Sequence, residues 1–148
     1  MSWPHYFLPP IVTVFCAAIS YFASQYLGGN IPMTTHWLGF VVIMIALFNI
    51  VRTLRLIRFN KTAINTFKAP SRFIKTGPFK FSRNPIYLGF LMILIGIGLL
   101  LGTFSGFIGA FLFFMVADLW YIPFEEDKCG QIFGKEYLDY KQNVRRWI

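Results

Sequence analysis

Four long apolar stretches alternate with shorter polar connections along this chain of 148 residues. The stretches cover about residues 7–27, 35–54, 86–101 and 103–124. At about 1.5 Å of rise per residue, a helix of about 20 residues crosses a hydrocarbon core of about 30 Å. The pattern therefore predicts an all-α, polytopic membrane protein with about four transmembrane helices, organised as a single domain over residues 1–148.

Two polar segments complete the predicted topology. Residues 55–85 are expected to form a loop, because prolines and Gly77 interrupt any long helix there. Residues 125–147 carry aromatic and apolar side chains at steps of about three and four residues, which is typical of an amphipathic helix. We expect this C-terminal helix to lie on the membrane surface or to cover the loop. Pro123 is expected to end or kink the last span just before it.

The charge distribution supports the membrane prediction and suggests a sidedness. Hydrophobic residues make up 56% of the chain and charged residues only 14%. The first 51 residues carry no charged side chain, which a solvated protein surface could hardly tolerate. Nine of the 14 basic residues lie within residues 52–83, without an acid among them. A basic loop beside a span indicates the cytoplasmic face and contact with membrane lipids, not nucleic acid. Both termini are then cytoplasmic as well.

The polar side chains on that face are few, and they exclude several kinds of chemistry. Cys16 and Cys129 do not have the number or spacing of a disulfide framework or a metal site. His5 and His36 flank apolar runs without a second ligand, so no metal is expected. Without a nucleophile and base pair, a hydrolase is disfavoured. Arginines, carboxylates and aromatics suit an amphoteric, nucleotide-like ligand such as S-adenosylmethionine.

Two features inside the spans each allow two interpretations. Gly96 and Gly98 favour close packing between helices over a cofactor-binding Gly-x-Gly, because no strand precedes them. Asp118 is the one acid within a span. It is either a functional residue or the partner of a buried cation, with Arg83 and Arg52 as the candidates.

Several motifs follow one another in the C-terminal half. They are Lys75-Thr76-Gly77-Pro78-Phe79, Arg83-Asn84-Pro85-Ile86-Tyr87-Leu88-Gly89, Glu125-Glu126 and Phe133-Gly134-Lys135-Glu136-Tyr137. In this order they resemble the integral-membrane methyltransferases, which include isoprenylcysteine carboxyl methyltransferases and phospholipid methyltransferases. The resemblance covers about residues 71–147. It implies an enzyme that transfers a methyl group from S-adenosylmethionine, its cofactor, to a lipophilic acceptor.

The resemblance also implies a set of site residues. Glu125 would contact the cofactor, and Glu126 belongs to the same pair. The other cofactor-binding residues implied are Ser71, Arg72, Phe73, Ile74, Phe79, Asn84, Pro85 and Tyr87. Arg83 is the candidate catalytic residue, as the ligand of the cofactor's carboxylate or of an anionic group on the acceptor.

Two departures from the isoprenylcysteine branch leave the acceptor open. That branch usually carries His at the position of Asn84, whereas Asn is also similar to the phosphatidylethanolamine branch. Its eukaryotic members carry a substrate-linked Arg at the position of Tyr121. The acceptor is therefore expected to be a carboxylate, amine or thiol on a membrane-soluble molecule.

Two other functions remain alternatives at this point. Membrane sterol reductases resemble the same group in their C-terminal half, and the basic loop could hold the phosphates of NADPH. A lipid-binding scaffold without catalytic activity would use the same loop to bind anionic headgroups. The carboxylate pair and the short chain favour the methyl donor.

Overall fold

Six α-helices form the protein in the computed structural model, which describes residues 9–32, 36–60 and 73–148. The α-helices are α1 (Pro9–Leu27), α2 (His36–Phe59), α3 (Pro85–Leu101), α4 (Ile108–Val116), α5 (Ile122–Phe133) and α6 (Lys135–Asn143). Shorter turns are η2 (Gly77–Lys80), η3 (Phe104–Phe107) and the π-helical η4 (Ala117–Tyr121). Within these ranges the only β-structure is an isolated bridge, so the predicted all-α class is confirmed.

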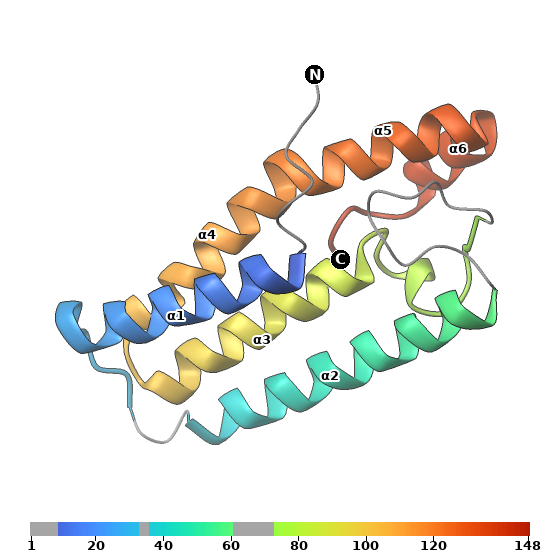
Figure 1. The fold of residues 1–148 in the computed structure, drawn as a ribbon. Coiled ribbons are helices and arrows are strands. Elements are labelled where there is room, and N and C mark those ends of the chain that lie inside the picture. Colours follow the sequence, from blue (N-terminus) through green and yellow to red (C-terminus); the bar gives the residue numbers. More distant parts are fainter. Residues whose placement is uncertain (1–8, 33–35, 61–72) are drawn as a thin grey trace.

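Helix α3 lies at the centre of the bundle, with α2 on one side and α1 and α4 on the other (Figure 1). Helices α4 and α5 continue one another through η4 as a single long rod, and α6 folds back near the end of α5 (Figure 1). The core between α1, α3 and α4 includes Cys16, Leu94 and Phe113. This arrangement brings the start of α3 beside α5, which is where the predicted site residues lie.

Glycines let these helices approach each other closely. A side chain at Gly96 would meet Ile43 and the carbonyl oxygen of Gly39 on α2, the latter at 2.8 Å. A side chain at Gly109 would lie 2.0 Å from the carbonyl oxygen of Cys16 on α1. Apolar lipid offers no hydrophobic drive between helices, so such close packing supplies much of their attraction. The packing interpretation of the glycines in α3 is therefore confirmed.

Three helical stretches are long and apolar enough to cross a membrane: Pro9–Leu27, His36–Phe59 and Phe104–Phe133. Helix α3 is also apolar but shorter, and at 17 residues it is about 25 Å long. Large apolar side chains on the outer surfaces of α1 and α2 are exposed, among them Phe22 and Phe48. This is the surface expected of a polytopic membrane protein, whose lipid-facing side chains are as apolar as its core.

The two turns at one end of the bundle are hydrogen-bonded to each other. Ile31 N donates to Gly102 O at 2.8 Å, and Phe104 N donates to Gly29 O at 2.7 Å. Ser105 Oγ adds a hydrogen bond to the carbonyl oxygen of Gly28. The turn after α1 is thereby joined to the turn after α3, at the end opposite α6 (Figure 1).

The helix bounds differ from the predicted ones in two places. Helix α2 runs to Phe59, whereas the polar loop was expected to begin at residue 55. The three arginines that end the apolar run are exposed, while Thr53 and Ile57 between them are buried. Arginine is a good helix former, and no proline or glycine occurs between Arg52 and Asn60. The arginines therefore end the apolar run, but the helix continues through them to Phe59.

The predicted end of the span at Pro123 is also wrong, and the predicted helix over 125–147 has different bounds. Pro123 lies at the start of α5, directly after the π-helical turn η4. Proline lacks an N–H and its ring crowds the preceding turn, so the wider π turn accommodates it without ending the rod. The break comes at Gly134 instead, whose φ is +52°, and α6 ends at Asn143, followed by Val144 in an extended conformation.

Candidate functional site

The site is built around the segment Ser82–Asn84, which connects η2 to α3. Asn84 is the residue before α3, and Pro85 begins the helix, where a missing N–H costs nothing. Asn49 of α2 donates to the carbonyl oxygen of Pro85 at 2.7 Å and holds the start of α3 against α2. Asn84 and Ser82 are both buried. Their surroundings are therefore fixed by the fold.

The C-terminal tail lies along this segment. Arg83 N donates to Arg145 O at 3.0 Å, and Asn84 Nδ2 donates to Arg146 O at 3.1 Å. Ser82 Oγ makes a longer hydrogen bond of 3.3 Å to the same oxygen of Arg146. Residues more than 60 positions apart in the sequence thus form one side of the site.

The first predicted carboxylate, Glu125, contacts α3. Tyr87 donates its hydroxyl hydrogen to Glu125 Oε1 at 2.9 Å. The ring of Tyr87 is buried and stacks on Tyr121, with 6.0 Å between the ring centroids. The Arg-Asn-Pro-x-Tyr motif and the Glu pair, far apart in sequence, therefore meet in the structure.

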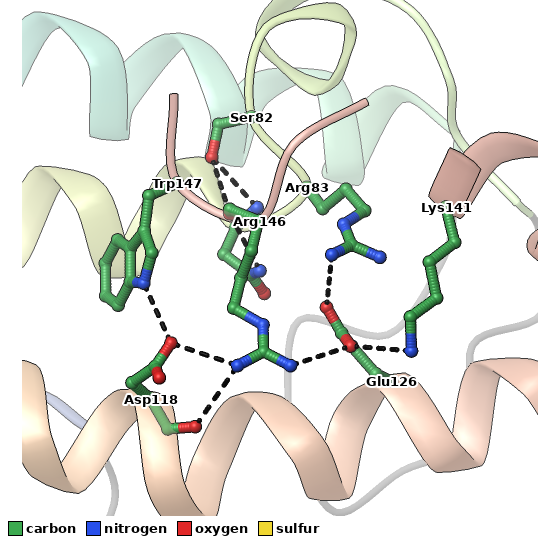
Figure 2. Close-up of polar contacts among 8 residues, drawn as sticks. Ser82, Arg83, Asp118, Glu126, Lys141, Arg146 and Trp147 are labelled. Carbon is green, nitrogen blue, oxygen red and sulfur yellow. Dashed lines mark hydrogen bonds and ion pairs between the residues drawn. The ribbon is translucent and has the colours of Figure 1, made fainter. Parts of the chain in front are cut away.

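The second carboxylate, Glu126, is surrounded by cations (Figure 2). Its side chain is only 5% exposed. Arg83 Nη2 lies 3.2 Å from Oε1, while Lys141 Nζ and Arg146 Nη2 lie 3.1 and 3.3 Å from Oε2. A buried carboxylate requires such partners, because desolvation otherwise penalises its charge heavily.

Arg146 joins two acids of the rod, Asp118 and Glu126. Its Nη1 lies 3.1 Å from Asp118 Oδ1, and Trp147 Nε1 donates to the same oxygen at 2.9 Å (Figure 2). The indole of Trp147 packs against Phe114, with 5.2 Å between the centroids. The prediction that Asp118 pairs with a cation is confirmed, but the partner is Arg146. Neither Arg83 nor Arg52 pairs with it.

The remaining predicted residues lie in or near an aromatic cluster. Phe73 stacks on Phe133 and contacts Tyr140 edge-on, both at 5.1 Å between centroids. Tyr140 donates its hydroxyl hydrogen to the carbonyl oxygen of Phe79 at 2.6 Å. Ile74 is half-buried beside this cluster's Phe73 in the sequence. The predicted residues Ser71 and Arg72 lie outside the described residues.

A groove of about 410 Å³ lies between α5 and α6, and Glu126 is one of the residues that line it. Its walls include the apolar side chains of Pro123 and Leu138 and the ring of Tyr137. Charged side chains of Lys141 and Arg146 also line it, together with the following residues: Glu126, Asp127, Gly130 and Gln131. The volume lies within the range of small-molecule sites.

Burial shifts the ionisation of the groups outside the membrane-spanning rod. Burial raises the pKa of the Tyr140 hydroxyl to about 12, against the opposing charge of Arg83. Burial, reinforced by Glu126, raises the pKa of Tyr137 above its ordinary range. For Arg146, burial by itself would lower the pKa, but hydrogen bonds to Asp118 and Glu126 outweigh it and raise the pKa. These tyrosines stay neutral and Arg146 stays charged at neutral pH.

Sequence reasoning missed Lys141, Arg146 and Trp147. All three lie within the predicted C-terminal helix over residues 125–147, where a charged side chain is expected to face solvent. One feature of the sequence could have indicated the tail: Asp118 within a span requires a cation, and Arg145 and Arg146 are adjacent near the C-terminus. The sequence pattern does not indicate which of the two arginines contacts Asp118.

The arrangement suits binding and orientation more than acid–base or nucleophilic chemistry. No group of three metal-ligating side chains occurs in the part of the chain that the structure describes. Carboxylates, guanidinium groups, an amide and tyrosines instead surround one place at the start of α3. These are the groups that would hold a ligand carrying both positive and negative charges.

Comparisons with known proteins place this geometry in context. A family model described as phospholipid methyltransferase matches residues 34–136 of the chain. An uncharacterized protein of Haemophilus influenzae is 40% identical over 63 residues, which are 43% of this chain and 100% of that protein. No solved structure matches the chain.

Proposed function

Because this chain belongs to the phospholipid methyltransferase family, a group of integral-membrane methyltransferases, we propose that it uses S-adenosylmethionine to methylate a lipophilic acceptor. The observation that carries the proposal is the contact between the two motifs. The Arg-Asn-Pro-x-Tyr segment meets the Glu pair through Tyr87 and Glu125, and again through Arg83 and Glu126. These two contacts bring the groups proposed to bind the cofactor to one place.

The residues around this contact fit the proposed cofactor. Glu125 is half-buried and offers a carboxylate for an ammonium group or a ribose diol, with Tyr87 fixing its direction. Arg83, Asn84 and the aromatic rings nearby offer donors and flat surfaces. The remaining walls proposed are Ser71, Arg72, Phe73, Ile74, Phe79, Pro85 and Glu126.

When bound, the cofactor supplies a methyl group on a sulfonium that is already activated. The protein then has to align donor and acceptor, which can account for a large part of a rate enhancement. Residues of this site are held for that task by the fold. Asn84 is anchored to the tail, Tyr87 to Glu125, and Arg83 to Glu126.

The acceptor is proposed to reach the site from the bilayer. Trp120 and Phe124, on either side of Tyr121 in the rod, are exposed and apolar. A lipophilic carboxylate, amine or thiol could approach along such a surface without leaving the membrane. Positively charged residues at the end of α2 support a cytoplasmic position of the site, where the soluble cofactor is available.

Calorimetric titration of the detergent-purified protein with S-adenosylhomocysteine tests the proposal. Wild-type protein should bind, and Glu125→Gln should weaken binding by about 5- to 150-fold, the equivalent of about 1 to 3 kcal/mol. Asp127→Asn is the matched control, since it removes the same charge two residues away at an exposed position.

The proposal is rejected if wild-type protein does not bind S-adenosylhomocysteine while NADPH binds, which would indicate a reductase. Binding of anionic lipid alone would instead indicate a scaffold. Equal effects of Glu125→Gln and Asp127→Asn would mean that Glu125 does not contact the cofactor.

A further inference from the structure

Arg83 is buried but only partly paired. Its side chain is 9% exposed, and Nη2 is the one nitrogen in contact with Glu126. The other two nitrogens, Nε and Nη1, are buried and make no hydrogen bond to any residue that the structure describes. Buried donors are nearly always satisfied in folded proteins, since leaving them unpaired is costly.

The backbone that carries this guanidinium is held in place by the C-terminal tail. Its backbone nitrogen is bonded to Arg145 O, and both neighbouring side chains, Ser82 and Asn84, are bonded to Arg146 O. Rotation would also break the ion pair with Glu126. The two unpaired nitrogens therefore lie in a segment that the tail and Glu126 both hold in place.

The local charge is also unbalanced. Three cations, Arg83, Lys141 and Arg146, contact Glu126, and Arg146 also contacts the carboxylate of Asp118. The connected group thus carries one more positive than negative charge, counted over these residues. Asp127 lines the nearby groove, but it is exposed and its carboxylate accepts from Gln131.

We propose that the buried, unpaired nitrogens of Arg83 bind an oxyanion of a ligand, a carboxylate or a phosphate. Either group has several oxygens to accept from Nε and Nη1, and either would neutralise the excess charge. The inference rests on the proposed function, which offers two sources: the carboxylate of the cofactor and an anionic headgroup in the bilayer.

Binding of two matched pairs of ligands to wild-type and Arg83→Lys protein tests whether Arg83 binds an oxyanion and identifies which ligand supplies it. Arg83→Lys keeps a positive charge for Glu126 and removes the planar set of donors. Lys80→Gln is the control, because Lys80 is exposed in η2. The ligands for calorimetry are S-adenosylhomocysteine and its decarboxylated analogue, and a short-chain phosphatidylglycerol with the corresponding diacylglycerol.

If the cofactor's carboxylate is the oxyanion, Arg83→Lys weakens S-adenosylhomocysteine at least tenfold and leaves the decarboxylated analogue unchanged. If a headgroup phosphate is the oxyanion, the same variant weakens phosphatidylglycerol tenfold and leaves both adenosyl ligands unchanged. Equal weakening of both members of a pair, or no weakening of any ligand, overturns the inference.

Wild-type protein provides an independent test should Arg83→Lys fail to fold. In one of the two pairs, it should bind the ligand that carries the carboxylate or phosphate at least tenfold more tightly than the ligand that lacks it. Equal binding within both pairs would overturn the inference. Absence of binding by both adenosyl ligands would reject the proposed cofactor, whereas the lipid pair would still test Arg83.

Discussion

Arg146 is expected to hold the C-terminal tail on the rod formed by α4, η4 and α5. Arg146→Met removes its charge and retains most of the length of the side chain. The substitution breaks the ion pairs from Nη1 to Asp118 and from Nη2 to Glu126. Arg145→Met is the matched control, because Arg145 is exposed and contributes its backbone oxygen to the site.

The magnitude follows from the exposure of the three side chains. Arg146 is 32% exposed, Asp118 27% and Glu126 5%. Exposed ion pairs contribute up to about 1 kcal/mol, and breaking a fully buried pair costs about 3 to 5 kcal/mol. Glu126 keeps two other cations, and Asp118 keeps the indole of Trp147. We therefore expect a loss of about 2 kcal/mol, or about 4 to 8 °C in the melting temperature of a chain of this size.

Thermal unfolding in detergent, followed by far-ultraviolet circular dichroism, measures this loss for Arg146→Met, Asp118→Asn and the double variant. The pair should show a coupling free energy of about 1 kcal/mol, because the two side chains are in direct contact. Additive effects in the double variant, or equal melting temperatures for Arg146→Met and Arg145→Met, would refute the role assigned to Arg146.

Two further substitutions test the fold around the site. Tyr140→Phe removes the hydrogen bond to Phe79 O and should cost about 1 kcal/mol at pH 8. Because the folded pKa of about 12 exceeds the ordinary 10.0, the wild-type stabilisation is complete below pH 10 and is lost as pH rises toward 12. Melting temperatures at pH 8 and 11 should therefore fall less in Tyr140→Phe, and an equal fall would contradict this. Gly109→Ala should destabilise by about 1 to 3 kcal/mol through contact with Cys16, whereas Gly130→Ala has room; equal melting temperatures would argue against close α1–α4 packing.

Local patterns were sufficient to predict the class of the fold. Apolar runs indicated the helices, because a segment in lipid must satisfy its own backbone hydrogen bonds. The motif around Arg83 and the Glu pair were also identified as parts of one site. Their contact through Tyr87 and Glu125 is consistent with that prediction.

The contacts of the C-terminal tail could not be predicted in the same way. Val144 and Trp147 continue the helical spacing of the apolar residues before them, so the sequence favours a helix. The tail instead exchanges helical hydrogen bonds for contacts with Ser82, Asn84 and Asp118. These partners are distant in the sequence, and tertiary contacts routinely override local preference.

The accommodation of Pro123 has a similar cause. A proline within a helical pattern indicates a break, because the usual spacing of hydrogen bonds has no place for its ring. A π-helical turn changes that spacing over Ala117–Tyr121, and no residue pattern announces it. The turn also carries Asp118 and Tyr121, in keeping with the frequent occurrence of π turns at functional sites.

The hydrogen bonds between the turns after α1 and α3 hold these two helices together at the end of the bundle opposite α6. With Ile31 bonded to Gly102 and Phe104 bonded to Gly29, any separation of α1 from α3 would be largest at the opposite ends of the two helices. A tilt of about 10° over a helix of about 25 Å displaces its free end by roughly 4 Å, close to the width of an alkyl chain. If the acceptor enters from the bilayer as proposed, these turns would limit how far that entrance widens, although they lie at the opposite end of the bundle from α6.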